Sequence, residues 1–274
     1  MDKNIALDFV LRKKIVRKYL DNMKVDSNHR FKSWEHCYKA FGNQTKEDDE
    51  LALHLAFYLA SWGMYRGSCG IFWKDYKIHI KTIDTIRNFY NLRNKWYVSK
   101  DIIRIIELYK EIQSYYSKLK YYKADGTELD VSATDTLVTK IMLGTIGCVP
   151  AIDNLFKVGA GIYSNRSFDE KLMVQIIEFS EKNRDCIRQC QSLIQAELEY
   201  FYPPMKIVDM YFWQLGYDEF QKKKTKLYIF QSCCVTLYGR VCCHNNLFNI
   251  ISVKPCQKLF YGNVIGADSV KRRN

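Results

Sequence analysis

The sequence contains no run of about 18 apolar residues, and nothing at its start has the form of a secretory signal. The first absence predicts that the chain has no membrane-spanning helix. The charged segment that follows Met1 lacks the uninterrupted apolar core of a signal peptide. We therefore expect a cytoplasmic protein, in which the ten cysteines stay reduced rather than forming disulfides.

The familiar short motifs of catalysis are also missing. There is no His-Glu-x-x-His, no Gly-x-Ser-x-Gly, no Gly-x-Gly-x-x-Gly and no P-loop order of Gly-x4-Gly-Lys-Ser/Thr. The adjacent cysteine pairs Cys233-Cys234 and Cys242-Cys243 do not have the Cys-x2–4-Cys spacing of zinc ligands. The sequence thus predicts no metal and no cofactor, and whether the protein is an enzyme stays open.

Acidic residues are almost absent after residue 220. Residues 221–274 hold ten Lys and Arg but one acid, Asp268, a balance of +9 that leaves +3 of the formal +12 for residues 1–220. The same segment holds five of the ten cysteines and none of the five tryptophans. We predict a helical domain over 1–220 and a basic, cysteine-containing tail over 221–274.

What the first 220 residues do contain is apolar residues at helical spacing. The order is helix after helix without alternating strands, which predicts an all-α, multi-helix bundle. The tail is expected to be irregular or short-stranded, with apolar runs at 227–230, 235–237 and 249–253. The helices are expected over 4–24, 31–41, 47–68, 76–93, 100–120, up to 142, up to 182, 185–200 and 205–215.

Basic residues cluster within the first expected helix. Arg12, Lys13 and Arg17 lie between its apolar positions, together with Lys14 and Lys18. Such a charge run is usually a solvated outer face. The alternative is a helix that contacts phosphates.

The expected helix over 47–68 is apolar almost all round, which places it at the centre of the bundle. His54, Ser61 and Arg66 are its polar exceptions, and burying such groups without partners costs about 1–3 kcal/mol each. They must therefore reach partners or a cleft. His54 is either a satisfied core histidine or a binding residue. Arg66 either satisfies carbonyls at the helix end or binds a ligand.

Two other segments pair a lysine with an aspartate. Lys140 precedes a corner made by Gly144, Gly147 and Pro150, and Asp153 follows it. Asp153 either caps the next helix or projects into a cleft as a catalytic carboxylate, with Lys140 one helix back. Lys206 and Asp209 lie three residues apart and can pair across one helical turn.

The segments 61–68, 143–153 and 202–213 resemble a family of uncharacterised bacterial and phage-type helical proteins that has no assigned activity. The resemblance covers roughly residues 30–216. Lys140 and the run Val149-Pro150-Ala151-Ile152-Asp153 are also similar in order to the helix-hairpin-helix DNA glycosylases, although the Pro-Gly-x-Gly of their hairpin is missing. That second resemblance implies catalytic roles for Lys140 and Asp153.

The charge, the basic first helix and the many tyrosines favour a nucleic-acid-associated protein that binds DNA or RNA. Two alternatives stay open. One is a protein-interaction module of the host–phage conflict type, and the other is an enzyme acting on a DNA base through Asp153, Lys140, His54 and Arg66.

Overall fold

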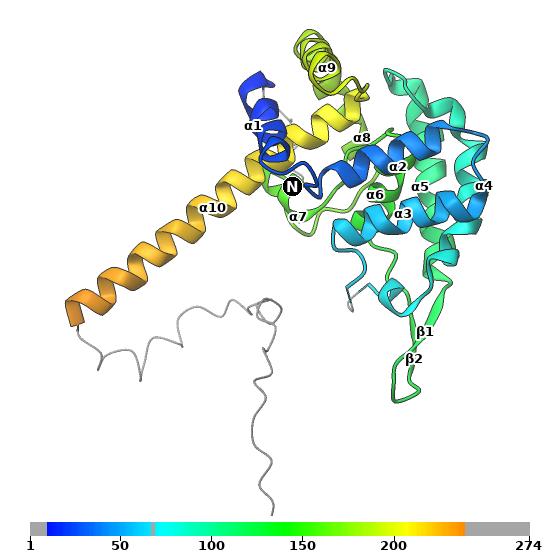
Figure 1. The fold of residues 1–274 in the computed structure, drawn as a ribbon, viewed down its shortest axis with the longest axis horizontal. Helices are drawn as coiled ribbons and strands as arrows, with labels where there is room; N and C mark the ends of the chain where they lie inside the picture. Colours follow the sequence, from blue (N-terminus) through cyan, green and yellow to red (C-terminus); the bar gives the residue numbers. More distant parts are fainter. Residues whose placement is uncertain (1–9, 67–68, 239–274) are drawn as a thin grey trace, which may run out of the picture. The chain divides into compact units, whose positions relative to one another are not determined.

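The computed structural model describes residues 10–66 and 69–238, with side chains as far as Thr225. The chain divides into two compact units, Met1–Lys223 and Lys224–Asn274. The first unit is an all-α, multi-helix bundle, as the helical spacing predicts, with one small antiparallel hairpin (Figure 1).

The first half of this bundle alternates α-helices with short 3-10 turns. Apolar positions at helical spacing put one face of each helix into the core and leave its charged residues outside. The elements are α1 (Lys13–Lys24), α2 (Lys32–Gly42), α3 (Asp48–Ser61), η1 (Ile71–Trp73), η2 (Tyr76–His79), α4 (Ile80–Asn88), η3 (Tyr90–Leu92), η4 (Ser99–Asp101) and α5 (Ile102–Ser117).

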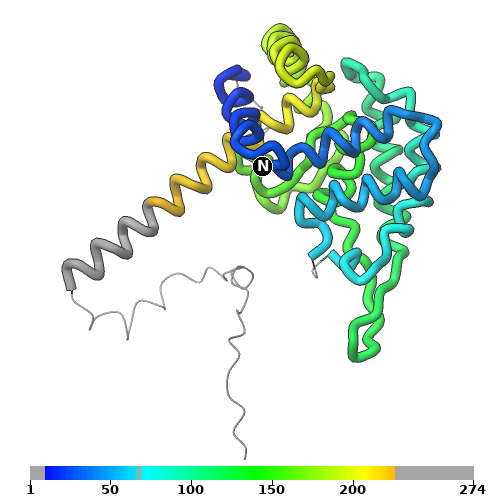
Figure 2. The backbone as a smooth tube through the Cα atoms, viewed as in Figure 1, coloured from blue at the N-terminus to red at the C-terminus, as the bar shows by residue number. Residues whose placement is uncertain are grey.

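A hairpin separates the two halves, and the tube view shows it extending beyond the helices that flank it (Figure 2). Lys120 pairs with Asp130 across it, and Gly126 takes a left-handed φ of 81° in the turn. The remaining elements are β1 (Lys120–Tyr122), β2 (Glu128–Asp130), α6 (Asp135–Thr145), α7 (Asn154–Gly159), α8 (Glu170–Lys182), α9 (Arg184–Leu198) and α10 (Pro204–Tyr238).

The centre of the bundle is α6, not the helix over 47–68 as the apolar pattern suggests. Every residue from 137 to 145 is buried, and α2, α3 and α5 pack around it. On α3, by contrast, Leu53 and Phe57 are more than half exposed. Gly144 lets α3 approach closely, because a Cβ there would lie 2.5 Å from the Tyr58 ring.

Helices α7 and α10 cross in backbone contact at two glycines. A Cβ on Gly159 would lie 1.9 Å from the carbonyl oxygen of Phe212, and one on Gly216 would lie 1.9 Å from that of Leu155. Gly216 therefore serves a helix crossing and does not end a helix. The prediction of a helix over 205–215 stopping there is wrong, because α10 continues to Tyr238.

Other expected boundaries also shift. The helix expected to reach Ser68 ends at Ser61, and Gly63 follows it with a left-handed φ of 76°. The apolar runs over 227–230 and 235–237, expected to be short strands or irregular tail, fall inside α10, while the run over 249–253 lies outside the described residues. The strands of the hairpin are not among the expected elements, because they are only three residues each.

Candidate functional site

The structure brings Lys140 of α6 together with Asp153, which immediately precedes α7. Lys140 Nζ donates to Asp153 Oδ2 over 2.9 Å, and the lysine side chain is 3% exposed. The other oxygen, Asp153 Oδ1, accepts from the Phe156 backbone N–H, so Asp153 caps α7. Capping, one of the two roles that the sequence leaves open for Asp153, is thus combined with an ion pair in the same carboxylate.

A second buried pair lies on α10. Lys206 Nζ donates to Asp209 Oδ2 over 2.8 Å, with both side chains less than a tenth exposed. Asp209 Oδ1 accepts from the Ala151 backbone N–H, which ties α10 to the corner before α7. Lys206 also donates to the Tyr19 hydroxyl over 3.3 Å. The predicted pairing of Lys206 and Asp209 across one turn is confirmed.

Trp62, just after the end of α3, joins the two pairs. Its ring centroid lies 4.9 Å from Lys140 Nζ and 5.8 Å from Lys206 Nζ, which are cation–π distances. The same ring stacks on Phe31 and meets Trp213 edge to face. Its Nε1–H is buried without a hydrogen-bond partner. A donor in that position calls for an acceptor atom beside the two pairs.

An exposed arginine, Arg30, lies against the rings of Trp62 and Phe31. The exposed Arg30 guanidinium carbon is 4.9 Å from the Trp62 ring centroid and 5.5 Å from that of Phe31. Arg30 also donates to the Ser61 carbonyl over 3.1 Å. Arg30 thus satisfies a carbonyl at the end of α3, the structural role that the sequence suggests for Arg66.

Arg66 itself is exposed and folds back on the turn. The Arg66 guanidinium lies so near the backbone of the turn that a Cβ on Gly63 would be 2.8 Å from it. Arg66 thus lies four residues after Trp62, within one turn of it. Neither Arg30 nor Arg66 forms an ion pair with any carboxylate that the structure describes.

The turn that carries Trp62 and Arg66 is held at its far side by a buried histidine. His79 Nε2 lies 2.8 Å from the Tyr65 hydroxyl, and His79 Nδ1 bonds the Tyr116 hydroxyl. Burial lowers the pKa of His79 to about 3, so the ring is neutral and can donate from one nitrogen while accepting at the other. This network fixes Tyr65 and with it the turn.

His54 makes none of the contacts described above for Trp62, Arg66, Lys140 and Asp153. It lies on the surface of α3, where Nε2 is 3.6 Å from Glu50 Oε1, and its pKa is lowered by partial burial. The predicted constellation of His54, Arg66, Lys140 and Asp153 is therefore incomplete. Lys140 and Asp153 touch, Arg66 is close to their neighbour Trp62, and His54 lies apart.

The basic residues of α1 are largely engaged by neighbouring helices. Lys13 donates to Gln189, Arg17 pairs with Glu197 over 2.5 Å, and Lys18 pairs with Asp218 over 2.6 Å. These acceptors lie on α9 and α10, and the two carboxylates among them neutralise two of the five charges of the run. Arg12 and Lys14 are exposed and form no ion pair within the described part of the chain.

The electrostatics of the cluster act on the tyrosines around it. Burial, followed by the nearby Asp209 carboxylate, raises the pKa of Tyr19 and of Tyr58 well above the ordinary value for tyrosine. Both phenols are therefore neutral. The two lysines and two aspartates sum to no net charge, so the positive charge at this end of α3 comes from Arg30 and Arg66.

Sequence reasoning missed Trp62, Arg30, Tyr65 and His79 as parts of the site. Trp62 and Tyr65 lie in the apolar segment singled out around Ser61, but aromatic residues in such a segment are normally interpreted as core residues. Arg30 precedes α2 and His79 ends η2, so neither stands near the other residues in the sequence. The sequence feature that pointed to this end of α3 was the presence of the polar residues His54, Ser61 and Arg66 in an otherwise apolar segment.

Over residues 10–66 and 69–225, whose side chains the structure describes, no group of three or more His, Cys, Asp or Glu side chains is placed to hold a metal ion. None of the helices over residues 10–66 and 69–238 is both long and apolar enough to cross a bilayer. The chain matches no known family model, no curated protein and no solved structure.

Proposed function

We propose that this protein is a nucleic-acid-associated helical protein, and that it contacts the phosphate backbone at the C-terminal end of α3. One observation carries the proposal: Arg30 and Arg66 are exposed beside Trp62, and no described carboxylate neutralises them. Guanidinium groups bind phosphate oxygens in bidentate fashion. We name Arg30, Trp62 and Arg66 the α3-end surface.

The ion pairs of α1 favour this surface over the basic first helix. Arg17 and Lys18 are held by Glu197 and Asp218, so a phosphate would have to displace a carboxylate to reach them. Arg30 and Arg66 require no such displacement. The tail after residue 220 adds charge of the same sign, which supports non-specific association with a polyanion.

The test compares two arginine-to-glutamine variants of the full chain, Arg66→Gln and Arg12→Gln. Both side chains are exposed, and both substitutions remove one positive charge, so the tail contributes equally. We expect Arg66→Gln to weaken binding of a single-stranded oligonucleotide and to reduce the slope of log K against log[salt] by about 1. Arg12→Gln should change the affinity and the salt slope less. Fluorescence anisotropy over a salt series measures both quantities.

Negligible affinity of the unmodified chain for DNA and RNA at low salt would refute the proposal. Equal losses in the two variants would mean that the α3-end surface is not the contact. A structural cause is checked by thermal unfolding, because the Arg66 side chain makes no hydrogen bond to another described residue and its replacement should leave the melting temperature unchanged.

A second candidate is an enzyme that acts on a DNA base, and the contact between Lys140 and Asp153 favours it. An amine beside a carboxylate has the parts needed for nucleophilic attack with proton transfer. The test is borohydride trapping on DNA containing an abasic site, since an imine formed by a lysine would be reduced to a stable cross-link. A cross-link lost in Lys140→Met and kept in Lys206→Met would support it. No cross-link in the unmodified chain would exclude this lysine chemistry.

A further inference from the structure

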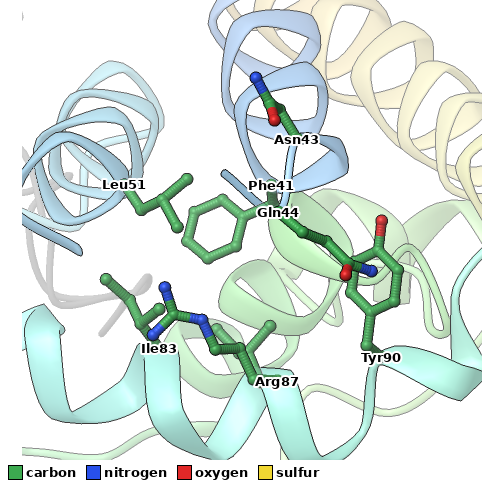
Figure 3. Close-up of a pocket in the computed structure, with 8 residues that line it drawn as sticks. Phe41, Asn43, Gln44, Leu51, Ile83, Arg87 and Tyr90 are labelled. Atoms are coloured by element: carbon green, nitrogen blue, oxygen red, sulfur yellow. The ribbon is translucent and has the colours of Figure 1, made fainter. Parts of the chain in front are cut away.

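A pocket separate from the α3-end surface lies where α2 ends, α3 begins and α4 ends (Figure 3). Its volume is about 330 Å³. That volume is at the lower end of the range for small-molecule sites and suits one ring system. Leu51 of this pocket is eleven residues before Trp62, a separation of roughly 16 Å along a helix.

The floor of the pocket is apolar. Phe41, Leu51, Ile83 and Ile86 are each no more than 5% exposed and come from three different helices. Figure 3 shows Phe41, Leu51 and Ile83 turned towards a shared space. A flat apolar ring placed on this floor would remove further apolar surface from water.

The rim supplies an aromatic ring and a carboxamide. Tyr90 is half-buried at the edge, and its hydroxyl donates to the Gly42 carbonyl over 3.3 Å, which fixes the ring. Gln44 extends towards Tyr90 in Figure 3, and its carboxamide bonds no other described side chain or backbone group. A carboxamide has a donor and an acceptor side by side, the pattern that pairs with the edge of a base.

The one charged residue that lines the pocket, Arg87, is already paired. Arg87 forms ion pairs with Asp48 and Asp84, so the pocket presents no free cation to an anionic ligand. The ligand should therefore be neutral, planar and polar at one edge. We propose that this pocket binds a single nucleobase, lying on the apolar floor beside Tyr90 and read by Gln44.

Neutral nucleosides provide the test, because they carry no phosphate and leave the α3-end surface and the basic tail out of the measurement. Each of the common nucleosides is titrated into the full chain and followed by ligand-observed NMR. The variant is Gln44→Ala, and the control is Gln195→Ala on α9, an exposed glutamine remote in sequence. We expect saturable binding of at least one nucleoside, weakened about tenfold in Gln44→Ala and unchanged in Gln195→Ala.

A second arm identifies the source of the base. An oligonucleotide is compared with an abasic strand of the same length in the unmodified chain and in both variants. If free nucleosides do not bind but the base-containing strand loses affinity in Gln44→Ala alone, the base arrives within a strand. If neither ligand distinguishes Gln44→Ala from Gln195→Ala, the pocket does not bind a base. That outcome leaves the test of Arg66 untouched, so the two proposals fail separately.

Discussion

Lys140 and Asp153, thirteen residues apart on either side of a glycine-rich corner, meet in a buried ion pair whose carboxylate also caps α7. One carboxylate thus joins the middle of the central helix to the start of the next. The ammonium group of the pair faces Trp62, and so does that of Lys206, which extends the arrangement to α3 and α10.

The first prediction concerns this pair. Lys140→Met leaves the Asp153 carboxylate without its cation, and losing one partner of a buried pair costs about 3 kcal/mol of unfolding free energy. Adding Asp153→Asn removes the stranded charge and keeps a capping oxygen. The double variant should then recover part of the loss in urea unfolding. A double variant no more stable than Lys140→Met would contradict this account.

The second prediction concerns the unpaired donor of Trp62. Trp62→Phe removes the buried Nε1–H and keeps a ring for Phe31 and Trp213 to contact. Relief of the unsatisfied donor offsets lost packing, so the change should stay within about 1 kcal/mol. Trp62→Ala deletes the ring and should cost about 3–5 kcal/mol. Urea unfolding measures both, and equal costs would show that the ring is not an anchor.

The third prediction follows from the pKa of His79, lowered by burial to about 3 in the folded chain against 6.5 unfolded. Between these values the unfolded chain binds more protons, so unfolding free energy falls as pH decreases below 6.5. The contribution lost between pH 6.5 and pH 5 is about 2 kcal/mol. It is fully present above pH 6.5.

His79→Gln removes this titration and should flatten the dependence of the melting temperature on pH between 7 and 5. His29 and His54 also have pKa values lowered by burial, so their titration likewise reduces the unfolding free energy as the pH decreases. The comparison is therefore between the variant and the unmodified chain under identical buffers. Parallel curves for the two proteins would rule out the neutral, buried state of His79.

The fourth prediction uses the glycine crossing of α7 and α10. Alanine in place of glycine normally stabilises a helix by about 1 kcal/mol. Gly216→Ala should instead destabilise the protein, because its Cβ would overlap the carbonyl oxygen of Leu155. Ala196→Gly on the exposed side of α9 gives the ordinary size of the propensity effect. A Gly216→Ala variant that is more stable than the unmodified chain would show that the helices do not cross there.

Local chemistry explains most of what the sequence predicted correctly. The helices follow from apolar spacing, and Asp153 caps α7 by accepting from the Phe156 backbone N–H, three residues away. The wrong boundary at Gly216 has a tertiary cause. A glycine next to a helix pattern is usually a stop, and only the crossing with α7 shows why it lies within α10.

In the candidate site, too, contacts between residues close in the sequence were predictable, and contacts between distant segments were not. The sequence determined that the chain forms a helical bundle, that Lys206 pairs with Asp209 and that Asp153 can cap a helix, because these depend on residues within one or two turns. Tertiary structure alone decided that Trp62 joins both ion pairs, that the acids of α9 and α10 engage the α1 cations, and that Arg30, not Arg66, satisfies the end of α3. Each of these depends on segments far apart in the chain, whose meeting is set by packing rather than by spacing.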